Sequence, residues 1–279
     1  MKMREILLDS IKYPLLNLKS LFSMGFMILI GSFLLSQYFD FDNYFGNKLG
    51  FTGLLLIILL IFVIFAVTTI LESGYTFRII EKSVIGIKKP PELNNFISMF
   101  KHGINEIIIA IIYFLIPIFI FIMILDAAFT QISFGLPTLS ENIINLFIII
   151  LAFLLFISDV LFTVAIPHMA FKGGSFKEAF RFREIFRKIK QIGLKQLLLG
   201  YLIVVLGLVA VGLPILKEIL ESANIVGFMI AELIVAPYIV IFYARFIALR
   251  YKSHSPIWYR TLTSIFWLDI LDISPKKWS

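Results

Sequence analysis

Long runs of apolar residues dominate this sequence and predict membrane-spanning helices. A helix needs roughly 20 mostly apolar residues to cross the hydrocarbon core of a bilayer. Six segments satisfy this requirement, near residues 21–39, 51–71, 104–125, 143–170, 194–216 and 225–249. Their apolar residues are consecutive, as in residues 54–61, and do not alternate with polar ones, which favours helices over strands. We therefore expect an all-α, polytopic integral membrane protein with six transmembrane helices.

Two segments between or before the spans have amphipathic patterns. In residues 2–18, apolar residues recur at helical spacing, so this segment is expected to lie on the inner leaflet as an interfacial helix. In residues 171–193, Gly173-Gly174 is expected to break the fourth span, and Ser175 with Glu178 fits a capping box that begins a helix over 176–192. Its basic side chains are candidate contacts for anionic lipid headgroups, namely Arg181, Arg183, Arg187, Lys188 and Lys190.

The loop between the second and third spans has a similar organisation. The second span is expected to continue as a helix to Gly86, followed by a stiff turn at residues 88–91 and a helix capped by Asn94 or Asn95. This helix enters the third span through Gly103, as residues 186–202 enter the fifth span through Gly193. The entry to the third span and the entry to the fifth span align without a gap, which predicts a parallel repeat of a span–elbow–span unit.

The C-terminal residues predict a separate segment. We expect residues 1–252 to form the six-span transmembrane domain and residues 253–279 to lie along the inner membrane surface. The apolar run 257–273 is short for a span and contains three charged residues, while all three Trp of the chain lie in this tail. A soluble, partly disordered tail is the alternative.

Composition and charge set the class and the orientation. The 279 residues are 60% hydrophobic and only 15% charged, which excludes an ordinary soluble domain. Of the 25 Lys and Arg residues, all but Lys48 and Lys217 fall in segments on one side of the predicted membrane. Basic residues of membrane proteins concentrate on the cytoplasmic side. We therefore expect a multi-pass protein of the cell membrane with both termini in the cytoplasm. The net charge of +7 therefore indicates topology and anionic lipid partners, not nucleic-acid binding.

The sequence contains few residues that indicate chemistry. It has no Cys, and its three His residues have no His or carboxylate at metal-ligand spacing. We therefore predict no catalytic residue, no metal site and no cofactor. Gly173-Gly174-Ser175 could bind phosphate at a helix N-terminus, but it lacks the Lys of a P-loop, so a structural break is the favoured interpretation.

Ionisable residues inside the spans are the candidate functional residues, because they are costly in lipid. They are Asp159 in the fourth span, and Glu232 and Arg245 in the sixth. Asp159 and Arg245 could form a structural ion pair. Alternatively, they could take part in transport or a proton relay, or lie at the periphery.

Several short motifs resemble a known family. They are Tyr13-Pro14, Gly74-Tyr75 with Arg78 and Ile79-Ile80, Leu93, Phe96, Gly103, Tyr113 with Pro117, Ile166-Pro167, Phe176 and Ala179-Phe180. Over about residues 4–252 the chain resembles the uncharacterised archaeal multi-pass membrane proteins grouped as domain of unknown function 4013. It departs from the family's usual Leu-Pro elbow, since Pro91-Glu92-Leu93 stands there. The resemblance implies a multi-pass membrane protein and brings no known activity.

The expected function is that of a non-enzymatic membrane scaffold or accessory protein with an unidentified protein partner. The alternative is a small transporter or lipid-handling protein with a path near Asp159, Glu232 and Arg245. A transporter requires these polar residues to converge on one cavity, whereas a scaffold requires only a packed core.

Overall fold

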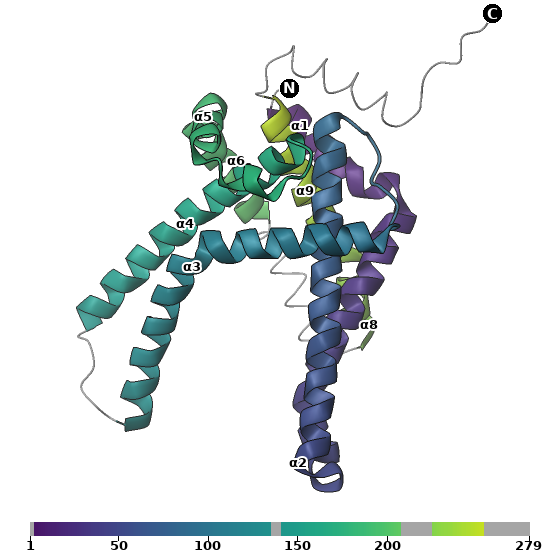
Figure 1. Cartoon of the computed structure of the whole chain (residues 1–279), viewed down its shortest axis with the longest axis vertical. Helices are drawn as coiled ribbons and strands as arrows, with labels where there is room; N and C mark the ends of the chain where they lie inside the picture. The colour runs from purple at the N-terminus through teal and green to yellow at the C-terminus, as the bar shows by residue number, and fades with distance from the viewer. Residues whose placement is uncertain (1–2, 135–140, 208–224, 254–279) are drawn as a thin grey trace, which may run out of the picture.

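The apolar runs form long helices in the computed structural model, which describes residues 3–134, 141–207 and 225–253 (Figure 1). Within these residues the structure is all-α. The elements are α1 (Met3–Lys12), a 3₁₀ turn (Tyr13–Leu16), α2 (Leu18–Ile85), α3 (Phe96–Phe134), α4 (Glu141–Phe171), the 3₁₀ turn η2 (Phe176–Phe180), α5 (Phe182–Ile192), α6 (Leu194–Gly207), α8 (Ile225–Ile230), the π-helical turn η4 (Ala231–Val235) and α9 (Ala236–Ser253).

The helical segment α2 doubles back on itself, so it contains both of the first two predicted spans (Figure 1). Gly31 of its first arm lies against Thr68 of its second arm. The two ends of α2 also lie close together, because the side chain of Asn17, just before α2, donates a hydrogen bond to the carbonyl of Pro90, just after it, at 3.1 Å. Between Leu18–Phe33 and Leu55–Ile85, the backbone is helical and reverses direction where an outer loop was expected (Figure 1).

Four stretches among the described residues are long and apolar enough to cross a membrane. They are Leu55–Ile85, Phe96–Asp126, Ile143–Phe171 and Val226–Ser253. A fifth arises if Met3–Leu16 and Leu18–Phe33, which meet at 80°, count as one broken span. Most of the predicted fifth span, 194–216, lies in α6, and the rest lies outside the described residues. The residues after Ser253, and with them the predicted interfacial tail, also lie outside the described residues.

Helix α3 crosses the second arm of α2 at a contact between two glycines. A Cβ atom at Gly103 would overlap the backbone of Ile70, and one at Gly74 would overlap the backbone of Met99. The absence of side chains thus lets the two backbones touch. Figure 1 shows the first part of α3 running across α2 before the helix bends away. Residues 55–74 of α2, which lead up to and include this crossing, span about 30 Å, the thickness of a hydrocarbon core.

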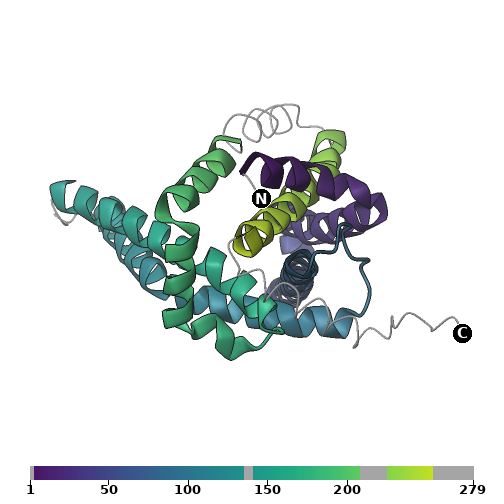
Figure 2. The same ribbon diagram turned by 90° about the horizontal axis from the view of Figure 1, so that it is seen from above.

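The buried core lies at one end of the molecule. Its fully buried side chains come from the end of α2 (Tyr75, Phe77), the start of α3 (Met99), the end of α4 (Ile166) and the middle of α9 (Ala244). The other ends of α3 and α4, and the part of α2 before Tyr75, expose large apolar side chains. Figure 2 shows α3 and α4 extending away from the group formed by α1, α2 and α9. The buried ends of the helices meet in one packed region, which we call the cap. Long apolar helices extend from it.

The loop between α2 and α3 is anchored to this cap and follows the predicted turn signals. Helix α2 ends at Gly86, which adopts the left-handed conformation at φ 102°. The Tyr13 and Tyr75 hydroxyls donate hydrogen bonds to the carbonyls of Lys89 and Pro91, at 3.1 Å and 2.7 Å. Asn95 accepts a hydrogen bond from the backbone N–H of Ser98 at 3.3 Å, as expected of a residue that caps α3.

Candidate functional site

The elbow between α4 and α6 contains a cluster of charged side chains in contact with one another. Gly173 and Gly174 both have positive φ, so the chain turns sharply after α4. It then forms η2 and α5, and Gly193, with φ 85°, separates α5 from α6. The predicted single helix over 176–192 is wrong, because η2 and α5 are separated at Arg181. The predicted capping box is also absent, since the Ser175 side chain makes no capping hydrogen bond.

Helix α5 buries some of its apolar side chains and exposes most of its basic ones, while its Phe182 and Phe186 are also exposed. Ile185 and Ile192 are buried in the cap. Four of the five predicted headgroup contacts are exposed, namely Arg181, Arg183, Arg187 and Lys190. Lys188 does not fit that prediction, because it is only 6% exposed and its Nζ lies 4.4 Å from the centre of the Tyr251 ring. A cation–π contact with α9 thus keeps this side chain buried in the cap.

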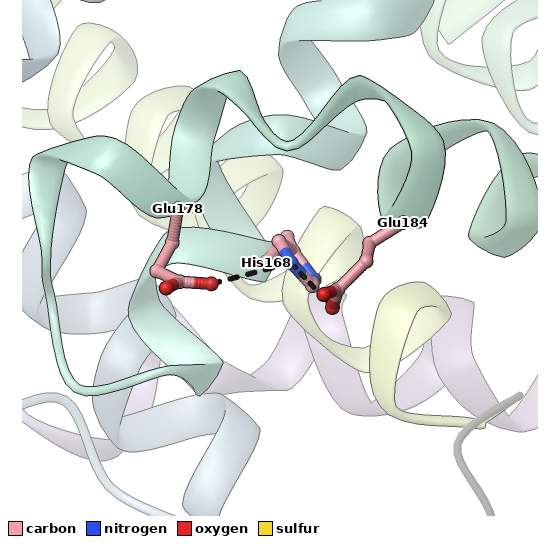
Figure 3. A group of neighbouring side chains, drawn as sticks. All are labelled: His168, Glu178 and Glu184. Atoms are coloured by element: carbon pink, nitrogen blue, oxygen red, sulfur yellow. Dashed lines mark ion pairs between the residues drawn. The ribbon is translucent and has the colours of Figure 1, made fainter.

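His168 at the end of α4 lies between two carboxylates that the elbow brings together (Figure 3). Its Nε2 is 3.4 Å from Glu184 Oε2 of α5 and 3.9 Å from Glu178 Oε2 of η2. The three side chains could hold a metal ion, since one ligand atom from each lies within 4.8 Å of the others. The sequence spacing gave no sign of this group, because the turn at Gly173-Gly174 folds η2 and α5 back onto α4.

Two cations balance these carboxylates. Arg181 contacts Glu178 Oε1 and Glu184 Oε1, each at 3.2 Å, and Lys172 Nζ lies 3.7 Å from Glu184 Oε2. Partial burial alone would raise the pKa of Glu184, but the neighbouring cations Lys172 and Arg181 lower it. Glu184 is therefore held in its charged form.

The same group connects the elbow to α9. Nδ1 of His168 and the Tyr251 hydroxyl are hydrogen-bonded at 2.7 Å, and both side chains are buried. A further hydrogen bond, from Tyr113 of α3 to the carbonyl of Ala179 at 2.6 Å, holds η2 in place. The elbow is thus fixed to both α3 and α9.

Asp159 is half-buried inside α4 and its neighbours are not those expected. Its side chain is hydrogen-bonded to Tyr201 of α6, and Tyr243 of α9 lies close enough to interact with it electrostatically. Its Oδ2 is buried without a hydrogen-bond partner. Asp159 therefore lies among α4, α6 and α9.

The expected pairing of Asp159 with Arg245 is wrong. The Arg245 side chain is 3% exposed, and its Nε donates to Asp9 Oδ1 at 2.8 Å. Its Nη1 donates to the Ile87 carbonyl at 2.8 Å, and the guanidinium lies 4.3 Å from the centre of the Tyr13 ring. Arg245 thus joins α9 to the N-terminal segment and to the loop after α2, because these segments meet in the cap.

Glu232 has a third set of neighbours. It lies in the π-helical turn η4, beside Ser32 and Glu72 of the two arms of α2. Glu72 in turn interacts with Glu106, which is buried in α3 beside Ser73. Neither Glu72 nor Glu106 was selected from the sequence as a candidate functional residue. The fact that both lie in apolar helices is the signal that could have found them.

Comparison with known proteins supports the family resemblance. No curated protein and no solved structure matches the chain. Residues 54–217 match the model of a family described as protein of unknown function (DUF4013), and this stretch includes α3, α4 and the elbow. Because it makes up more than half of the 279 residues, the chain belongs to the DUF4013 family.

Proposed function

We propose that this protein is a non-enzymatic, multi-pass scaffold of the cell membrane, with six spans and both termini in the cytoplasm. In this proposal the packed cap lies at the cytoplasmic surface and the long apolar helices cross the bilayer. The exposed basic side of α5 binds anionic lipid headgroups and fixes the cap on the membrane.

The location of the core at one end of the molecule carries this proposal. The apolar helices expose large side chains at their other ends, such as Phe62 of α2, Phe119 of α3 and Phe153 of α4. Soluble proteins rarely expose apolar patches of this extent, whereas lipid chains solvate them without cost. The segments that meet in the cap are also those that contain most of the basic residues, which favours a cytoplasmic cap.

The separation of the intramembrane polar residues favours a scaffold over a transporter. Asp159, Glu232 and Arg245 have different partners, on different elements. An open groove of about 650 Å³ beside the first arm of α2 is lined mainly by apolar side chains such as Phe22 and Phe26, and by none of these three residues. Asp159, Glu232 and Arg245 therefore do not line one shared polar path of the kind that a transporter uses.

The headgroup contact can be tested by removing the exposed charges of α5. Each basic residue near an anionic surface contributes about 1 kcal/mol to binding. The test variant is Arg183→Gln, Arg187→Gln, Lys190→Gln, which keeps Arg181 because that side chain holds Glu178 and Glu184. The matched control removes three other exposed cations, through Lys88→Gln, Lys89→Gln, Lys101→Gln.

The measurement is the midpoint of thermal unfolding in detergent, with added phosphatidylglycerol or phosphatidylcholine. We expect phosphatidylglycerol to raise the midpoint of the native chain and of the control, and the α5 variant to lose most of this rise. Equal responses of the two variants, or equal effects of the two lipids on the native chain, would contradict headgroup binding by α5.

Transport can be tested separately in proteoliposomes that contain a pH-sensitive dye. We expect proton flux equal to that of empty liposomes. A flux that depends on the protein and is abolished by Asp159→Asn would instead establish the transporter alternative.

A further inference from the structure

We propose that His168, Glu178 and Glu184 bind one divalent transition-metal ion, for which Zn²⁺ is the best candidate. The site would join the end of α4 to η2 and α5 (Figure 3). It would act as a structural clip in the cap, and it is independent of headgroup binding by α5.

The spacing of the three side chains fits a transition-metal ion. Zinc binds His nitrogen and carboxylate oxygen at about 2.0–2.2 Å, so the ligand atoms of a tetrahedral site lie about 3.3–3.6 Å apart. His168 Nε2 is 3.4 Å from Glu184 Oε2 and 3.9 Å from Glu178 Oε2. All three ligand atoms lie within 4.8 Å of one another, so rotations of the two Glu side chains would bring them to three corners of a tetrahedron.

The unpaired nitrogen of His168 is the second observation that points to a ligand. His168 is 4% exposed, and its Nε2 has no hydrogen-bond partner. Its ring lies between the two carboxylates in Figure 3. Buried polar atoms almost always have a partner, so a buried unpaired nitrogen in this position needs an explanation. A bound metal ion would provide one.

The surroundings of the ring prepare Nε2 for metal binding. The Tyr251 hydroxyl lies 2.7 Å from Nδ1, and in the tautomer that binds a metal it accepts a hydrogen bond from the protonated Nδ1. The lone pair of the neutral imidazole then resides on Nε2 and is directed at the two carboxylates. Hydrogen bonding of the second ring nitrogen to an oxygen acceptor is the usual arrangement of metal-binding His residues.

Arg181 leaves one oxygen of each carboxylate available to the metal. It contacts Oε1 of both Glu178 and Glu184, while Oε2 of each faces His168. Oε2 of Glu178 is buried and without a hydrogen-bond partner. Arg181 would therefore orient the ligands from outside the metal shell, as groups around protein metal sites commonly do.

Lys172 is the group that competes with the metal. Its Nζ lies 3.7 Å from Glu184 Oε2, and its side chain is 27% exposed, so it can move toward solvent when a divalent ion arrives.

A ligand set of one imidazole and two carboxylates suits zinc, iron and manganese better than calcium or magnesium, which prefer oxygen ligands alone. The fourth position would be open to water.

The test uses the full-length chain in detergent, freed of metal with a chelator and purified on a tag without histidine. The probe is Zn²⁺ alone, measured by calorimetry and by elemental analysis after desalting. We expect one Zn²⁺ per chain. Glu178→Gln and Glu184→Gln should each lower the affinity at least tenfold, because each replaces a charged ligand with a neutral one.

Co²⁺ and thermal unfolding provide readouts that a purely structural ion pair would not produce. Bound Co²⁺ should give the visible absorption of a tetrahedral site in the native chain, and this absorption should be lost in both Glu variants. Zn²⁺ should raise the unfolding midpoint of the native chain and not that of the two Glu variants, since a ligand that binds only the folded state stabilises it.

The matched control is His102→Gln, which removes a His that is stacked on Phe77 and lies outside the proposed site. This variant should retain native zinc binding. Substoichiometric Zn²⁺ on the native chain, or native affinity in both Glu variants, would overturn the proposal. The two Glu side chains are partly exposed, so both variants are expected to fold, and size-exclusion profiles without metal verify this.

Discussion

Arg245 is a buried charge whose partners come from distant parts of the sequence. Asp9 supplies the counter-charge, the Ile87 carbonyl accepts a hydrogen bond, and the Tyr13 ring covers the guanidinium. Buried charges need such partners, because an uncompensated one is strongly destabilising. The ion pair with Asp9 therefore fixes α1 against α9 within the cap.

A double-mutant cycle tests this pair. Asp9→Ala should lower the free energy of unfolding by about 1–3 kcal/mol, because it leaves a buried guanidinium without its counter-charge. Arg245→Met leaves Asp9, whose side chain is 39% exposed and can be hydrated. The double variant should therefore be more stable than the sum of the single effects predicts, with a coupling of about 0.5–3 kcal/mol. SDS titration in mixed micelles measures the four free energies, and strictly additive effects would contradict the pairing.

At the scale of elements, the contact between α2 and α3 sets the geometry of the cap. The two helices touch through Gly74 and Gly103, where any side chain would overlap the opposite backbone. Gly173, in the elbow, is a glycine of another kind. It has φ 81° and open space where a Cβ would lie. The first two positions thus depend on small size and the third on backbone conformation.

Substitution by alanine should destabilise the protein to different extents at these two kinds of glycine. Gly173→Ala should destabilise the protein by about 1–2 kcal/mol, the usual cost of a left-handed residue with a side chain. Gly103→Ala should destabilise it by more, because the backbone of Ile70 cannot move aside without separating the helices. Thermal unfolding in detergent gives the order of the midpoints, and a smaller effect of Gly103→Ala would contradict the proposed contact.

The sequence predicted those elements whose signals are local. Apolar runs indicated the long helices, Gly86 the end of α2, and Asn95 the start of α3. The elbow was less predictable, because Ser175 and Glu178 match a capping box in sequence while the backbone there forms a 3₁₀ turn held by Tyr113. Lys188 matched a basic helix face, but its position over Tyr251 depends on where α9 packs. Contacts between distant segments decided these cases, and the spacing of residues in one segment does not contain that information.

Contacts between distant segments also explain why the candidate site could not be predicted from the sequence. His168, Glu178 and Glu184 are separated by ten and six residues, which matches no local metal motif, and only the reversal after α4 brings them together. Conversely, Asp159 and Arg245 both lie inside predicted spans and were expected to pair, but each is satisfied by a different helix. Sequence therefore identified residues that need partners without identifying the partners.

At the scale of the whole molecule, the proposed orientation places the cap in the cytoplasm. Segments with most of the basic residues meet there, as the contacts of Arg245, Tyr13 and Tyr251 demonstrate. The reversal of α2 lies at the opposite end (Figure 1). If the cap is cytoplasmic, the loop between α3 and α4 must be outside, because each of these two helices then crosses the membrane once.

Cysteine labelling tests this orientation, and the native chain provides a background without cysteine. Thr138→Cys lies in the predicted outer loop, beyond the described residues, and should react with an impermeant maleimide on intact cells. Arg187→Cys, on the exposed side of α5, should react only after permeabilisation. Arg187 is a better probe than Lys188, which is buried against Tyr251. Lys88→Cys, in the loop between α2 and α3, should behave like Arg187→Cys, because Tyr13 holds the neighbouring Lys89 in the same cap. Labelling of Thr138→Cys and Arg187→Cys from the same side would show that α4 does not cross the membrane. Labelling of Lys88→Cys and Arg187→Cys from opposite sides would place the two halves of the cap on different sides of the membrane.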